Sequence, residues 1–218
     1  MKDEDLRRHI AAELSWDPQV DTEGINISAA DGTVTLRGTV TSLRLKQAGG
    51  RAAARVRGVT SVVNELQVEL PDADRRDDED LRGDVREALM LDASVPTTVD
   101  AQAQGGLVTL TGAVQWHYQR EAAESRTTDV PGVAGINNAI TLTQTPDAYA
   151  AREAITGAFR RNASLEVDVL SAETSHGGRV TLSGTVSSWA AHDQAVTAAW
   201  SAPGVTQVDD RIRVESRP

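Results

Sequence analysis

The sequence predicts an α+β protein made of three tandem modules, each a small αββαβ fold with a three-stranded mixed sheet and two helices packed on one face. Three signals that recur in fixed register support this prediction. A Val-Thr-Leu-x-Gly run at 34–38 returns at 108–112 and 180–184, a Gly-Val pair begins 20 residues after each final glycine, and an alternating apolar run begins four residues later. This repetition indicates a duplicated unit of about 70 residues, a length that can form a small domain.

Each module is expected to begin with an amphipathic helix, because apolar residues four apart lie on one helical face. This spacing occurs three times: Leu6, Ile10, Leu14; Leu81, Val85, Leu89; and Ala151, Ile155, Phe159. A short strand is expected next in each module: 25–27, 99–101 and 165–169. Glycine turns then predict a hairpin into the second strand: 31–32, 105–106 and 177–178. In module 3, residues 171–177 are expected to form a longer hairpin loop.

The Val-Thr-Leu-x-Gly run is expected to be the second strand, and an alanine-rich helix should follow it in each module: 48–56, 122–130 and 190–202. Because this helix is a crossover connection, the third strand should run parallel to the second. Six glycines are expected to be structural, three where a strand ends close to other backbone and three just past a helix, where a left-handed residue is favoured. They are Gly38, Gly112 and Gly184, and Gly58, Gly132 and Gly204.

The repeat also predicts where the modules begin and end. Module 1 is expected at 1–71, an acidic linker at 72–79, module 2 at 80–142, a short linker at 143–147 and module 3 at 148–216.

The combined motif consists of Val-Thr-Leu-x-Gly, then Gly-Val, then Val-x-Asn-x-Leu-x-Val. It resembles that of the BON domain, a family named for bacterial osmotically inducible and nodulation proteins. Module 1 has the fullest motif at 63–68 (VNELQV), module 2 keeps Asn138, and module 3 carries Asp210 at that position. The resemblance covers nearly the whole chain and implies three tandem BON domains in an OsmY-like, stress-linked, non-enzymatic binding protein. Family members are proposed to contact phospholipid surfaces or hydrophobic ligands. Another BON architecture is a cytosolic potassium-binding protein.

Composition and charge exclude several classes of protein. The formal charge of −10 argues against nucleic acid, which is bound by clustered Lys and Arg. The absence of cysteine excludes disulfides, thiol nucleophiles and Cys-ligated metals. No apolar run approaches the roughly 20 residues needed for a transmembrane segment. Residues 1–9 lack the apolar region of a secretory signal, so a cytoplasmic protein is expected, and a periplasmic or exported one would require a trimmed signal.

No catalytic residue, cofactor or metal site is predicted. The four histidines fall in non-equivalent positions without metal-ligand spacing: His9, His117, His176 and His192. Phosphate-binding and nucleophile-elbow motifs are absent from the sequence. The acidic residues of the first linker resemble a calcium loop only loosely, since the central Gly and terminal Glu are missing. Two interpretations stay open for that linker, a solvated connector with acids at a helix N-terminus and weak association with a divalent cation or potassium.

Two groups of residues are candidates for binding. The first is the arginine stripe, Arg44, Arg51 and Arg55, with Lys46 and Arg57 nearby. It is either a solvated helix face or a patch for anionic lipid headgroups or an acidic partner. The second is a set of large apolar residues between the second strand and second helix: Leu43, Trp116, Tyr118 and Trp189. These either anchor a membrane interface or partner, or pack against their own module or between modules. Trp16 and Trp200 are expected at the edge of the core.

The sequence therefore favours a non-enzymatic adaptor of the bacterial osmotic or envelope stress response that binds a phospholipid surface or a protein partner. The alternative is a cytosolic protein that senses a small cation, such as potassium, or a metabolite. The relative packing of the modules and the oligomeric state are left open.

Overall fold

The computed structural model describes residues 3–16, 24–143, 148–162, 170–175 and 177–215. It contains three modules of one design, which confirms the α+β prediction. Module 1 consists of α1 (Asp3–Trp16), β1 (Ile25–Ala30), β2 (Thr33–Val40), α2 (Leu43–Arg55) and β3 (Ser61–Val68). Module 3 consists of α5 (Ala148–Arg161), β9 (Leu170–Ser175), β10 (Arg179–Val186), α6 (Trp189–Trp200) and β11 (Gln207–Val214).

Module 2 follows the same order with a divided sheet. After the 3-10 turn η1 (Asp72–Asp74), it consists of α3 (Asp78–Met90), β4 (Asp100–Gln104), β5 (Leu107–Thr111), β6 (Ala113–Val114), α4 (His117–Thr128), β7 (Gly135–Asn138) and β8 (Thr141–Leu142). Here β4, β5 and β7 form one sheet, while β6 and β8 form a separate parallel pair.

The strand pairing is the one that the repeat predicts. The hairpin β1–β2 is antiparallel, with Ile25 opposite Gly38, and β2–β3 is parallel, with Thr33 opposite Ser61. Modules 2 and 3 repeat this arrangement in β4-β5-β7 and β9-β10-β11. The parallel third strand follows from the crossover through the second helix.

Each module has its own apolar core between its helices and its sheet. The first helix of each module buries the predicted stripe, such as Leu6, Ile10 and Leu14 in α1, and the second strand contributes alternate residues such as Val34 and Leu36. The period of 3.6 in the helices and of 2 in the strands accounts for these faces. Among the described helices, none is long and apolar enough to cross a bilayer.

Gly38 lies inside β2 and not at its end. Its φ is +125°, and a Cβ there would overlap the carbonyl oxygen of Gly24. Gly112 has the same relation to the carbonyl oxygen of Thr98. The three glycines that follow the second helices also have positive φ: Gly58, Gly132 and Gly204.

Several sequence predictions need correction. The second helices of modules 1 and 2 begin five residues earlier than expected, and Ser42 explains the start of α2, because its side chain accepts a hydrogen bond from Leu45 N at 3.2 Å. Residues 171–175 belong to strand β9, so the longer hairpin loop predicted there is wrong. The strand predicted at 165–169 lies outside the described residues. Trp16 is 85% exposed and does not sit at the edge of the core.

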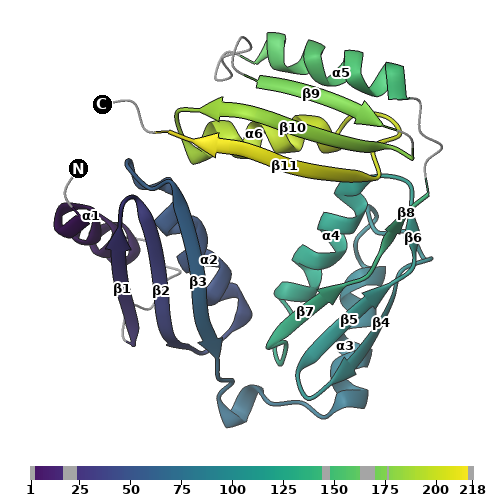
Figure 1. The fold of residues 1–218 in the computed structure, drawn as a ribbon. Coiled ribbons are helices and arrows are strands. Elements are labelled where there is room, and N and C mark those ends of the chain that lie inside the picture. The colour runs from purple at the N-terminus through teal and green to yellow at the C-terminus, as the bar shows by residue number, and fades with distance from the viewer. Residues whose placement is uncertain (1–2, 17–23, 144–147, 163–169, 176, 216–218) are drawn as a thin grey trace.

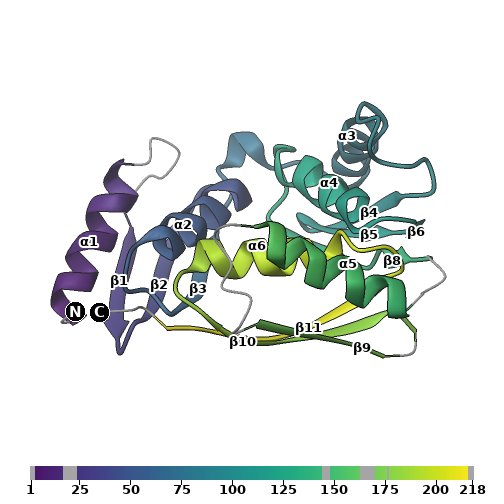
Figure 2. The same ribbon diagram turned by 90° about the horizontal axis from the view of Figure 1, so that it is seen from above.

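The three modules lie around a common centre (Figure 1). The second helix of each module, α2, α4 and α6, lies on the inner side, and the first helix, α1, α3 and α5, on the outer side (Figures 1 and 2). This arrangement brings the N-terminus of α6 next to α2 although the two helices are far apart in the sequence (Figure 2).

Candidate binding site

The arginine stripe runs along α2 with all three guanidinium groups exposed. Arg55 forms an ion pair with Glu13 at 3.2 Å, whereas Arg51 has no ion pair among the described residues. Lys46 is half-buried, and its main-chain carbonyl accepts a hydrogen bond from Asn64 Nδ2 at 2.7 Å. The stripe therefore offers cationic side chains to solvent, and Lys46 has a structural main-chain contact beside it.

The four apolar candidates lie in different surroundings. Leu43 is only 8% exposed and belongs to the core cluster of module 2. Trp116 is the half-buried N-cap residue of α4, and Tyr118 is 54% exposed in the first turn of that helix. Trp189 is the first residue of α6 and packs against the core of module 1. Of the four, Trp189 comes together with residues of the arginine stripe.

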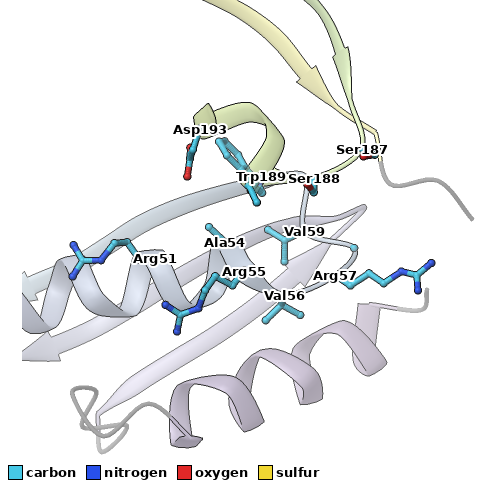
Figure 3. Close-up of a pocket in the computed structure, with 12 residues that line it drawn as sticks. Arg51, Ala54, Arg55, Val56, Arg57, Val59, Ser187, Ser188, Trp189 and Asp193 are labelled. Carbon is cyan, nitrogen blue, oxygen red and sulfur yellow. The ribbon is translucent and has the colours of Figure 1, made fainter. Parts of the chain in front are cut away.

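A cavity of about 570 Å³ lies where the start of α6 meets the end of α2. We call it the junction cavity (Figure 3). Trp189 of module 3 lines it together with Ala54, Val56 and Val59 of module 1. Polar residues from both modules complete the lining: Arg51, Arg55, Arg57, Ser187, Ser188 and Asp193. The cavity thus combines an apolar wall with three guanidinium groups.

The first turn of α6 holds Trp189 in place. Ser188 caps the helix by accepting a hydrogen bond from Ala191 N at 3.2 Å. The ring of His192 packs edge-on against the indole of Trp189, with centroids 4.6 Å apart and an interplanar angle of 65°. On its other side, His192 Nε2 hydrogen-bonds to Asp210 Oδ2 at 2.7 Å.

Module 3 differs from the other two modules in the hydrogen bond made at position 210. In modules 1 and 2 an asparagine stands at this place, and its Nδ2 donates to a main-chain carbonyl of the second helix, that of Lys46 or Arg120. A carboxylate cannot donate such a bond, so Asp210 instead hydrogen-bonds to the ring of His192. The asparagine-to-aspartate change is thereby linked to the position of Trp189.

One polar group of the junction cavity has no partner. Trp189 Nε1 is buried and makes no hydrogen bond within the described part of the chain. A buried donor without an acceptor is costly, so it destabilises the packed position of the indole. Arg57, on the opposite side of the cavity from Arg51 (Figure 3), makes no ion pair with any described residue.

Some acidic residues of the first linker stabilise the start of α3. Asp77 is the N-cap of α3, and its side chain accepts hydrogen bonds from Glu79 N at 3.1 Å and Asp80 N at 2.9 Å. The acids that follow lie in the first turn of α3, where negative charge is favourable. In the described ranges, no three His, Asp or Glu side chains gather as a metal site would require.

Sequence reasoning found part of this site. It singled out Arg51, Arg55 and Trp189, but not their meeting across two modules. It named Arg57 only as a neighbour of the stripe and Val59 only as part of the Gly-Val signal, and placed neither in a binding site. It also missed the His192–Asp210 pair, for which the change from Asn to Asp in module 3 was the available signal.

A family model described as the BON domain matches residues 2–69, 77–144 and 148–216. One similar solved structure, described as CdsD, a structural protein of the type III secretion system of Chlamydia trachomatis, is 15% identical, with 98% of this chain and 93% of that chain covered and a TM-score of 0.28. The C-terminal domain of CdsD is 14% identical, with 99% and 100% covered and a TM-score of 0.27. No curated protein matches the chain.

Proposed function

Since the chain belongs to the BON domain family, we propose that it is a non-enzymatic adaptor of the bacterial osmotic or envelope stress response that binds an anionic phospholipid surface through the junction cavity. The observation that carries this proposal is the meeting of Arg51, Arg57 and Trp189 around one apolar-walled cavity. These are the groups that an anionic amphiphile requires, because guanidinium groups pair with phosphate and an aromatic ring packs against glycerol or acyl carbons.

The contacts within the proposed site follow from its lining. A phosphate at the mouth would pair with the guanidinium group of Arg51 or of Arg57, which lie on opposite sides of the cavity (Figure 3). The apolar part of the lipid would face Ala54, Val56 and Val59. Asp193 also lines the cavity, and its carboxylate repels an anionic ligand. Removal of any one of the arginines should therefore weaken the binding of an anionic lipid.

The overall charge of −10 limits the affinity of the whole chain for an anionic surface. Like charges repel over a Debye length of about 8–10 Å at physiological salt. Binding should therefore be moderate and local, with module 1 toward the membrane. Residues 72–145 carry thirteen acids and six bases, so module 2 should point away from it.

Vesicle flotation tests the proposal. We expect the chain to float with vesicles that contain phosphatidylserine and not with pure phosphatidylcholine, and flotation should fall as salt rises. Arg51→Gln should reduce flotation by about fivefold or more, since charge near a membrane surface contributes about 1 kcal/mol per arginine.

Arg44→Gln is the matched control, because Arg44 lies on the same stripe of α2 but does not line the junction cavity. Equal losses from Arg44→Gln and Arg51→Gln would attribute binding to the stripe as a whole and reject the cavity. Failure of the chain to float with any vesicle would reject lipid binding. A rise in melting temperature with potassium alone would then favour the cation-sensing alternative.

A further inference from the structure

The three modules are joined at three corners of one kind. At each corner, the first residue of a second helix contacts another module, and the three residues are repeat-equivalent, five positions after the glycine of the second strand: Leu43, His117 and Trp189.

At the first corner, module 1 inserts a side chain into module 2. Leu43, at the start of α2, belongs to the same buried cluster as Leu81, Val85 and Ala123. One turn further along α2, Gln47 Nε2 hydrogen-bonds to Thr128 Oγ1 at 3.4 Å, and Thr128 is the last residue of α4. The start of α2 therefore meets the end of α4.

At the second corner, module 2 contacts module 3 in the same way. His117, the first residue of α4, stacks on Trp200, the last residue of α6. The ring centroids are 3.8 Å apart and the planes are inclined by only 9°. The start of α4 therefore meets the end of α6.

At the third corner, module 3 contacts module 1. Trp189 at the start of α6 packs on the module 1 core and faces Ala54 near the end of α2. Ala54, Thr128 and Trp200 are themselves repeat-equivalent, four residues before the glycine that ends each second helix. The three head-to-tail contacts close a ring with an approximate threefold repeat, a geometry in which heterologous contacts close on themselves.

The third corner differs from the other two in two respects. It joins modules 1 and 3, which are not consecutive in the chain, whereas the other corners join neighbours. It also contains the junction cavity of about 570 Å³, while Leu43 is buried at the first corner and two rings stack at the second. The third corner is thus closed without a direct chain connection between its two modules, around a space that a ligand can occupy.

We propose that the Trp189 corner opens and closes, and that an anionic phospholipid bound in the junction cavity holds the ring closed. This inference rests on the proposed function and adds its regulation. The lining of the cavity comes from modules 1 and 3, so a lipid that contacts both binds the closed ring and has only half its site in the open one. A ligand shifts such an equilibrium by its difference in affinity for the two states.

The coupling is reciprocal. Trp189→Ala removes the contact that closes the ring, and the same variant should bind lipid at least tenfold more weakly. His192 and Asp210 should act as positioning residues, since they hold the indole without lining the cavity.

Distance measurements by electron spin resonance test the proposal on the full chain. The sequence contains no cysteine, so two introduced cysteines carry the only spin labels. Gln67→Cys with Arg213→Cys reports on modules 1 and 3, and Gln67→Cys with Thr141→Cys reports on modules 1 and 2; all three positions are exposed and repeat-equivalent. The probe is a short-chain phosphatidylserine used as a monomer, with short-chain phosphatidylcholine as its control.

We expect two populations of the 67–213 distance without lipid, and one short distance with phosphatidylserine but not with phosphatidylcholine. Trp189→Ala should leave the long distance under all conditions. The 67–141 distance should stay unchanged throughout. Trp16→Ala is the matched tryptophan control, because Trp16 is 85% exposed and is not among the residues that line the junction cavity, and it should behave like the unaltered chain.

Two results would overturn the proposal and can be told apart. A single, unchanging 67–213 distance together with measurable phosphatidylserine binding would reject the coupling but leave lipid binding intact. No binding of phosphatidylserine by calorimetry or flotation would reject both. If Trp189→Ala itself does not fold, Trp189→Phe offers a milder change, with an intermediate open population as the expected result.

Discussion

Leu43→Ala tests whether the modules form one packed unit. Leu43 is 8% exposed in the core cluster of module 2, although module 1 contributes it. Burial of a leucine side chain is worth about 1.5–3 kcal/mol, and leucine-to-alanine changes at buried sites cost about 2–5 kcal/mol once the cavity is included. We expect a loss of about 3 kcal/mol. For a chain of this size that corresponds to a fall in Tm of about 6–12 °C, if the three modules unfold together.

The assay is thermal unfolding followed by hydrogen exchange. Leu91→Ala is the matched control, because Leu91 is 80% exposed and its loss should change the stability by no more than about 0.5 kcal/mol. In Leu43→Ala, amide exchange should accelerate in α3 and α4 of module 2, not only near the substitution. Equal melting temperatures for the two variants, or faster exchange confined to module 1, would refute the packing described here.

Three further predictions concern other parts of the molecule. Burial lowers the pKa of His117, and Glu121 partly offsets this shift, so the unfolded chain takes up the proton first as pH falls below about 6.5 and the stability of the corner declines. His117→Phe should keep the stack and make the urea midpoint of unfolding less sensitive to pH between 7.5 and 5.5. An unaltered dependence of the midpoint on pH would contradict this. Gly38→Ala should lower the free energy of unfolding by at least about 3 kcal/mol, because of the positive φ of Gly38 and the nearby Gly24 carbonyl. Gly83→Ala in α3 should raise it by about 0.5–1 kcal/mol, and urea unfolding measures both. Similar effects from the two variants would be inconsistent with the backbone geometry. Asp210→Ala should remove the hydrogen-bond partner of His192 Nε2 and weaken lipid binding roughly 2- to 10-fold, the equivalent of one hydrogen bond. Full binding by the folded variant would show that this pair does not position Trp189.

The fold of one module could be predicted from the sequence because its signals are local and repeat three times. The stripe of Leu6, Ile10 and Leu14 and the alternation around Val34 and Leu36 follow directly from helical and strand periods. The starts of α2 and α4 were missed because their first turns carry large or polar side chains instead of alanine. Capping by Ser42 was the signal that could have placed the start of α2 correctly.

Packing between modules could not be predicted in the same way. Leu43, His117 and Trp189 differ in size and polarity, so no shared residue type marks their common role. Each contacts a module that is remote in the sequence, and hydrophobic periodicity reports only which face of an element is buried, not what covers it. Trp16 and Trp200 illustrate this, since both end a helix, yet one is 85% exposed and the other stacks on His117.

For the candidate site, the residue types were predictable and their assembly was not. The arginine stripe follows from helical spacing on α2 alone. The junction cavity requires module 3 to return to module 1, which depends on the approximate threefold repeat of the corners. The linked change of Asn to Asp at position 210 became interpretable only with His192 beside it.

Quenching of a single tryptophan would test lipid contact at the junction. In a chain with Trp16, Trp116 and Trp200 replaced by phenylalanine, Trp189 is the one remaining indole. Phosphatidylserine vesicles with spin-labelled acyl chains should quench its fluorescence, and Arg51→Gln should reduce the quenching. A parallel chain that keeps only Trp16 should be quenched far less. Strong quenching of Trp16 with none of Trp189 would contradict lipid binding at the junction cavity.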